Sequence, residues 1–135
     1  MIYPQALDHV VLRTDRLQAM LDFYTRVIGC TPERSEEEIG LYQLRCGTSL
    51  IDIVPIDSPL GQDGGPPPGE QAHNMDHLCL RLSPFDGEGI LRFLEEHGVA
   101  HEGIQRRYGA EGFGPSIYIA DPQGNRVELK GPAEK

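Results

Sequence analysis

Two histidines in matching contexts are the residues of this sequence best suited to metal chemistry. His9 lies in segment 7–13 and His77 in segment 75–81, and in both an aspartate precedes the histidine and an arginine follows four positions later. The offset, 77 − 9 = 68 residues, is close to half of the 135-residue chain. Because histidine is a common metal ligand, this duplication favours a metal site shared by two halves of the chain.

The last predicted strand of each half also carries a carboxylate with apolar neighbours. It is Asp52 in the first half and Glu128 in the second. A carboxylate in such a strand is costly to bury unless it is paired or bound to a metal. Two imidazoles and two carboxylates suit a divalent transition metal such as Ni, Co, Mn, Fe or Zn. Such an ion can polarise a carbonyl, stabilise an enediolate or acidify water, and a carboxylate beside it can act as a base. The alternative is two core histidines and two ordinary sheet carboxylates.

Alternating apolar residues predict strands in the first half, with one helix between them. The helix is expected over 16–28, with Asp15 as its N-cap and Gly29 at its end. A short edge strand begins at Thr31, and the acidic run 33–38 is expected to be a solvated turn. The other predicted strands of this half span residues 7–13, 41–46 and 49–55.

The second half repeats this order of elements. Its helix is expected to begin at Ser83-Pro84, as N-cap and first helical residue, and to stop at Gly98. Residues 104–114 are polar and glycine-rich, which predicts a flexible loop. The predicted strands of this half span residues 76–82, 99–102, 116–120 and 126–130.

The positions of the four ligand candidates within their strands agree with one another. By alternation, His9, Asp52, His77 and Glu128 all lie on the face away from the helix. Neighbours on a strand point to opposite faces, so the aspartates that precede the histidines are not expected to pair with them.

Taken together, the elements predict an α+β protein of two βαβββ modules that form one curved mixed sheet. We expect a single domain over 1–135, with module one at 7–56 and module two at 75–130. The proline- and glycine-rich residues 57–74 join the modules, and their length leaves room for a lid over a site.

Composition narrows the choice of partners. A net charge of −9 without a basic run argues against nucleic acid, and no apolar run predicts a signal peptide or membrane span. Cys30, Cys46 and Cys79 form no CxxC motif, which favours reduced thiols and a cytoplasmic location. The expected partner is therefore a small molecule.

The modules resemble the vicinal oxygen chelate superfamily, which includes glyoxalase I, fosfomycin-resistance proteins, extradiol dioxygenases and bleomycin-resistance proteins. The likeness rests on Leu7-Asp8-His9, on Phe23-Tyr24 followed by Ile28-Gly29, and on segment 121–129, Asp-Pro-Gln-Gly-Asn-Arg-Val-Glu-Leu. It implies a homodimer with a divalent metal.

Carried over residue by residue, the resemblance implies metal ligands at His9, Asp52, His77 and Glu128. The pattern is that of bacterial glyoxalase I, except that Asp52 is one methylene shorter than the glutamate there. Arg13 matches an arginine that contacts the glutathione carboxylate, whereas Ile56 stands where an asparagine would help to hold glutathione.

The lead function implied is a glyoxalase-like lyase or isomerase acting on a small substrate with vicinal oxygens. Glu128, with Asp52 as the alternative, would move a proton through an enediolate. Ser116 and Tyr118 occupy positions that line the substrate pocket in the fosfomycin-modifying branch. The alternatives are an Fe(II) dioxygenase that uses His9, His77 and Glu128 as a facial triad, and a non-enzymatic small-molecule binding protein.

Overall fold

A computed structural model describes all residues from Met1 to Lys135, and the chain divides into two units, Met1–Asn74 and Met75–Lys135. The first unit contains β1 (His9–Thr14), α1 (Leu17–Asp22), a π-helical continuation η1 (Phe23–Val27), β2 (Thr31–Glu36), β3 (Leu41–Cys46), β4 (Ser49–Pro55) and a 3₁₀ turn η2 (Gly61–Gly64). The second contains β5 (Leu78–Arg81), α2 (Gly87–Glu96), β6 (Ile104–Gly109), β7 (Gly112–Ala120) and β8 (Arg126–Lys130).

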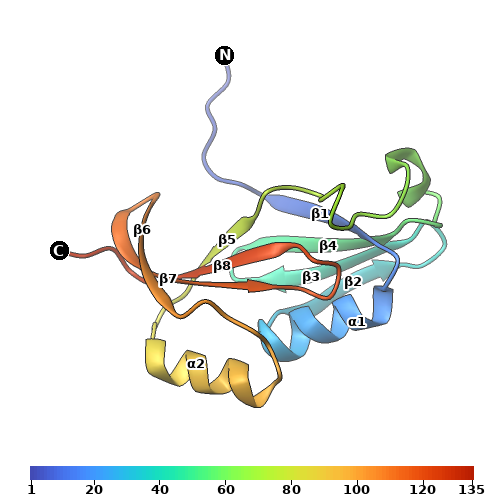
Figure 1. Ribbon diagram of the computed structural model, residues 1–135. Coiled ribbons are helices and arrows are strands. Elements are labelled where there is room, and N and C mark those ends of the chain that lie inside the picture. The colour runs from blue at the N-terminus through green and yellow to red at the C-terminus, as the bar shows by residue number, and fades with distance from the viewer. The chain divides into compact units, whose positions relative to one another are not determined.

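Both units have the same topology (Figure 1). The first sheet has strand order β1-β4-β3-β2 and the second β5-β8-β7-β6. In each sheet the first and last strands of the unit pair in parallel, and the remaining pairs are antiparallel. This repeat confirms the predicted α+β class and the two βαβββ modules.

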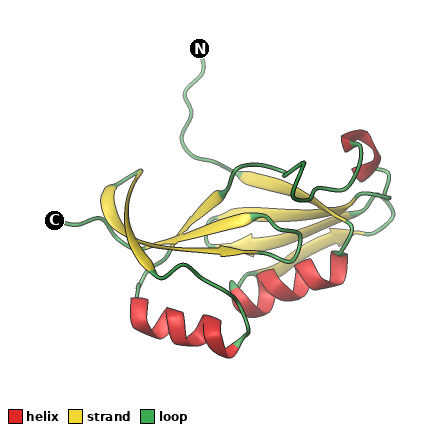
Figure 2. Cartoon of the chain, viewed as in Figure 1, coloured by secondary structure: helices red, strands yellow, loops and turns green.

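One face of each sheet supplies the hydrophobic core of its unit, and Figure 2 shows α1 running along the first sheet. In the first unit, Leu12, Ile51 and Ile53 are buried on the strands, and Met20 and Tyr24 are buried on the helical segment. In the second unit the buried residues are Leu94 of α2 and, on the strands, Ile117, Ile119, Val127 and Leu129. The alternation seen in the sequence therefore marks the core-facing positions correctly.

Two local predictions for the first unit were wrong. The helix begins at Leu17 with Arg16 at the N-cap position and no side-chain cap, so Asp15 is not its cap. The run 33–38 is strand up to Glu36, because β2 pairs with β3 along its length and its acidic side chains project into solvent. Glu33 forms an ion pair with Arg45, which stabilises a charged edge strand.

Three predictions for the second unit were also wrong. The helix begins at Gly87, because the carboxylate of Asp86, not Ser83, accepts a hydrogen bond from the backbone N–H of Gly89 at 3.1 Å. Residues 99–102 form no strand, and residues 104–114 are a hairpin instead of a loop. The hairpin turns between Gly109 and Gly112, and Gly112 has a φ of 120°, which a side chain would disfavour.

No helix of the structure is both long and apolar enough to cross a membrane.

Candidate functional sites in the two units

The first unit brings His9 and Asp52 to the same face of its sheet. In the parallel β1–β4 pairing, Val11 lies opposite Asp52 and His9 opposite Leu50, so all four side chains share that face. Asp52 is only 3% exposed. The side-chain amide of Gln43, the cross-strand partner of Asp52, donates to both of its carboxylate oxygens at 3.3 Å.

The imidazole of His9 is oriented by the residue before it. Its Nδ1 lies 2.7 Å from Oδ1 of Asp8. This hydrogen bond, followed by the negative charge of Asp52, raises the pKa of His9. Because a carboxylate only accepts, Nδ1 must carry the proton, and in the neutral ring the lone pair is on Nε2. A ring oriented in this way can bind a metal through Nε2.

The second unit repeats this arrangement at His77 and Glu128. Nδ1 of His77 lies 2.6 Å from Oδ2 of Asp76, and Nε2 lies 3.3 Å from Oε1 of Glu128. Glu128 is 5% exposed, although it lies on the face away from the core residues Val127 and Leu129. The imidazole nitrogen of His77 and a carboxylate oxygen of Glu128 therefore lie next to each other.

Glu128 is held as an anion by its neighbours. Ser116 donates its hydroxyl to Oε2 at 2.6 Å, and Tyr118 donates its hydroxyl to Oε1 at 3.0 Å. Burial by itself would raise the pKa of Glu128, but these hydrogen bonds, together with the positive charges of His77 and Lys130, outweigh it and lower the pKa. The group is thus ionised at neutral pH and fixed in orientation.

The expectation that Asp8 and Asp76 do not pair with their neighbouring histidines was wrong. Alternation of side chains applies inside a paired strand, but Asp8 precedes the first residue of β1. Asp76 and His77 both precede β5, which begins at Leu78. Just before a strand begins, the backbone is not held in the pleated geometry, so the side chains of adjacent residues can contact each other. His9 is thus paired with Asp8, and His77 with Asp76.

Arg13, expected to contact substrate, binds the long loop of its own unit. Its Nε and Nη2 donate to the carbonyl of Gly61 at 3.1 and 2.9 Å, and Nη2 also donates to Gly65 at 2.6 Å. Its Nη1 donates to Gly64 at 2.9 Å and to Pro66 at 3.4 Å. These bonds occupy all five N–H groups of a guanidinium, so in this conformation none remains for a substrate.

The other two predicted substrate-binding residues also have partners inside the protein. Ser116 has no exposed surface and Tyr118 is half-buried, and both hydroxyls are directed at Glu128. Their hydroxyl groups therefore hold the carboxylate of Glu128 in position.

Two residues of these sites were missed by the sequence analysis. Gln43 holds Asp52, and the buried Lys130 lies on the face of Glu128 and donates to the carbonyl of Arg107 at 2.8 Å. Cross-strand register was the signal for both, because Gln43 pairs with Asp52 and Lys130 with Ser116.

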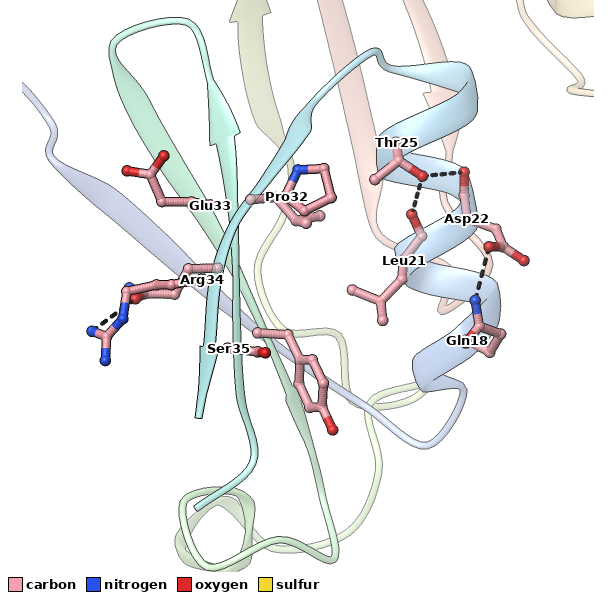
Figure 3. Close-up of a pocket in the computed structure, with 11 residues that line it drawn as sticks. Gln18, Leu21, Asp22, Thr25, Pro32, Glu33, Arg34 and Ser35 are labelled. Atoms are coloured by element: carbon pink, nitrogen blue, oxygen red, sulfur yellow. Dashed lines mark hydrogen bonds between the residues drawn. The ribbon is translucent and has the colours of Figure 1, made fainter. Parts of the chain in front are cut away.

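A hollow of about 340 Å³ in the first unit lies elsewhere, between α1 and strands β2 and β3 (Figure 3). On its helical side, Gln18 donates to Asp22 at 2.9 Å and Thr25 donates to the carbonyl of Leu21 at 2.7 Å. Neither His9 nor Asp52 lines the hollow, although Gln43, which donates to Asp52, does.

Each unit thus presents one imidazole and one buried carboxylate on the same face. Neither unit by itself gathers three histidine, cysteine, aspartate or glutamate side chains of the kind that hold a metal.

Sequence comparison identifies relatives of the chain. The profile of the family described as the Glyoxalase/Bleomycin resistance protein/Dioxygenase superfamily matches residues 6–129. The glyoxalase domain-containing protein RDO1 of Mycosarcoma maydis is 28% identical over 134 residues, which cover 93% of this chain and 67% of that protein.

Solved structures share the fold at low sequence identity. Virulence protein STM3117 from Salmonella typhimurium superposes with a TM-score of 0.82 at 23% identity, over 98% of this chain and 100% of that one. Lactoylglutathione lyase from Agrobacterium tumefaciens superposes with a TM-score of 0.68 at 23% identity, over 95% of this chain and 94% of that one. These similarities establish the fold. The reaction has to be inferred from the residues of the site.

Proposed function

Because the chain belongs to the glyoxalase/bleomycin resistance protein/dioxygenase superfamily, we propose that it is a metal-dependent, glyoxalase-like lyase or isomerase. Its substrate would be a small molecule with two adjacent oxygens, and its cofactor a divalent ion such as Ni, Co, Zn, Mn or Fe.

One observation carries this proposal: the same three-part arrangement occurs in both units. In each, an exposed aspartate holds Nδ1 of a histidine, and a buried carboxylate lies on the face of the sheet to which that histidine belongs. Aspartates that orient metal-binding histidines in this manner are a common feature around metal ions. Two unrelated core histidines 68 residues apart would not be expected to have the same kinds of partner.

The residues fit a metal in their chemistry and spacing. Metal–ligand bonds of about 2.1 Å place neighbouring ligand atoms about 3 Å apart in a coordination shell. The 3.3 Å between Nε2 of His77 and Oε1 of Glu128 is close to this value. When bound, such an ion supplies Lewis-acid polarisation of the substrate oxygens.

In the proposed reaction the protein side chains move the proton. Glu128, ionised because its pKa is lowered, would take a proton from the substrate carbon next to a carbonyl and return it to the adjacent carbon. Ser116 and Tyr118 would keep the carboxylate aligned during both transfers. Asp52 is the alternative base, since only the long hydrogen bonds from Gln43 restrain it.

We propose that His9, Asp52, His77 and Glu128 serve one metal ion together. Two protein ligands are too few for a stable site of this type, and each unit offers one histidine and one of these carboxylates. The full set would come from both units of one chain or from two chains of a homodimer.

The proposal is tested by reconstituting metal-free protein with each ion and assaying a hemithioacetal of methylglyoxal and glutathione. Turnover with Ni, Co, Zn or Mn that is lost on chelation supports the lyase or isomerase. Oxygen consumption with Fe(II) and a catechol would instead identify a dioxygenase. Absence of both activities while a small molecule binds would leave only a binding function.

Two isosteric variants separate the roles of the carboxylates. If Glu128 is the base, E128Q should lower kcat at least about 100-fold. The variant D52N should then mainly weaken metal binding. If Asp52 is the base, the larger loss of kcat occurs in D52N. H73A, at an exposed loop histidine, is the matched control and should change neither quantity.

A further inference from the structure

Two cysteines of the first unit lie next to each other, Cys30 just before β2 and Cys46 at the end of β3. The β2–β3 register pairs Thr31 with Arg45, so one further step along the antiparallel ladder places Cys30 opposite Cys46. Directly opposed residues in such a ladder have Cα atoms about 4.5–5.5 Å apart. Disulfides span Cα separations of about 4.4–6.8 Å, a range that includes the spacing of such a pair.

The two thiols also interact directly and differ in character. The Cys30 thiol donates a hydrogen bond to the sulfur of Cys46, which lowers the pKa of Cys46 to about 7. Cys46 is partly exposed, whereas Cys30 is buried. Cys46 is thus a partly exposed thiol of which a substantial fraction is thiolate at neutral pH, and Cys30 is a protected thiol placed next to it.

We propose that Cys30 and Cys46 form a reversible disulfide when the protein meets a hydroperoxide. This would be a modification site separate from the proposed metal chemistry. Cys46 shares a strand face with the core residue Leu44, and His9 and Asp52 lie on the other face of the sheet.

The reaction balances in two steps. The Cys46 thiolate attacks one peroxide oxygen, the O–O bond breaks, and the leaving oxygen takes up a proton to give water or an alcohol. Cys30 then attacks the sulfur of the resulting sulfenic acid, and the S–O bond breaks as an S–S bond forms. The departing hydroxide takes the Cys30 proton and leaves as water. Sulfur is oxidised by two electrons, and the peroxide is reduced by two.

The disulfide would connect the end of the first helical segment to its sheet. Cys30 follows that segment, and its backbone N–H donates to the carbonyl of Tyr24 at 2.8 Å. Cys46 ends β3 just before the turn at Gly47. Closing this loop restricts the unfolded chain, so we expect oxidation to raise Tm by roughly 5–15 °C.

The test uses the full chain treated with hydrogen peroxide and then blocked under denaturing conditions. Of the three thiols, two should disappear, and peptide mapping should join Cys30 to Cys46. Before blocking, the mass of the oxidised protein should be about 2 Da below that of the reduced protein. Dithiothreitol should reverse the change. The control C79S should lose both of its thiols in the same way.

The variant C30S should accumulate a sulfenic acid at Cys46 that dimedone traps, because the resolving thiol is gone. Retention of all three thiols in the wild type would overturn the proposal. So would a disulfide through Cys79, or oxidation of Cys46 to sulfinic acid without cross-linking to Cys30.

Discussion

The Nε2 atom of His77 lies 3.3 Å from Oε1 of Glu128. That one contact joins the residue just before β5 to the last strand, β8. Asp76 accepts a hydrogen bond from the ring of His77, and Ser116 donates one to the carboxylate of Glu128, so both partners are held in place. His9 and Asp52 share a sheet face in the first unit, where the charge of Asp52 contributes to the raised pKa of His9.

The aspartates behind the histidines should tune metal binding. D8A and D76A should each weaken Ni²⁺ or Co²⁺ affinity about 10–100-fold, because the ring loses the partner that fixes its tautomer and orientation. Isothermal titration gives the affinity. In metal-free protein, ¹⁵N chemical shifts of His9 or His77 should move toward a mixture of tautomers. D57A, at an exposed loop aspartate, is the control, and an equal loss of affinity there would contradict the assignment.

The guanidinium of Arg13 should organise the loop that surrounds it. R13K keeps the charge but cannot reach the carbonyls of Gly61 and Pro66 together. It should therefore lower the free energy of unfolding by roughly 1–3 kcal/mol and speed hydrogen exchange within 61–66. R26K, at an exposed position on the helical segment, should do neither. Unchanged exchange in R13K would show that the loop holds its conformation without this residue.

The hydroxyl groups beside Glu128 should give a pH-dependent contribution to stability in metal-free protein. Because the folded-state pKa of Glu128 is lowered, this contribution is complete above its ordinary value of about 4.3 and is lost as the pH falls through the lowered value. S116A should therefore be less stable than the wild type by about 1–3 kcal/mol at pH 7, with a smaller difference near pH 3. Urea unfolding at both pH values measures this, and an equal difference at both would contradict it.

Strand alternation was sufficient to predict much of the fold and the faces of the four ligand candidates. The strands at 41–46, 49–55 and 126–130 were predicted with the boundaries that the structure has, because apolar side chains alternate there with polar ones. The β6–β7 hairpin was missed since Gln105, Arg106 and Arg107 give no apolar alternation. Such an edge strand is stabilised by backbone pairing and not by burial.

The contacts within the two sites were harder to predict than their positions. The hydrogen bonds of Arg13 go to backbone carbonyls of a loop far along the chain, and no side-chain pattern encodes these. The pairing of Asp8 with His9 depends on where β1 begins, to within one residue. Boundaries of strands are the least certain part of any sequence-based prediction.

Because the two histidine–carboxylate pairs are proposed to bind one metal ion together, metal stoichiometry distinguishes one shared site from two separate sites. Titration of the metal-free protein with Co²⁺ should give one tightly bound ion per chain, whether the pairs meet within a chain or across a homodimer. H9A and H77A should each abolish tight binding, and H73A should bind as the wild type does. Two ions per chain in the wild type would contradict the claim. So would one ion remaining in H9A.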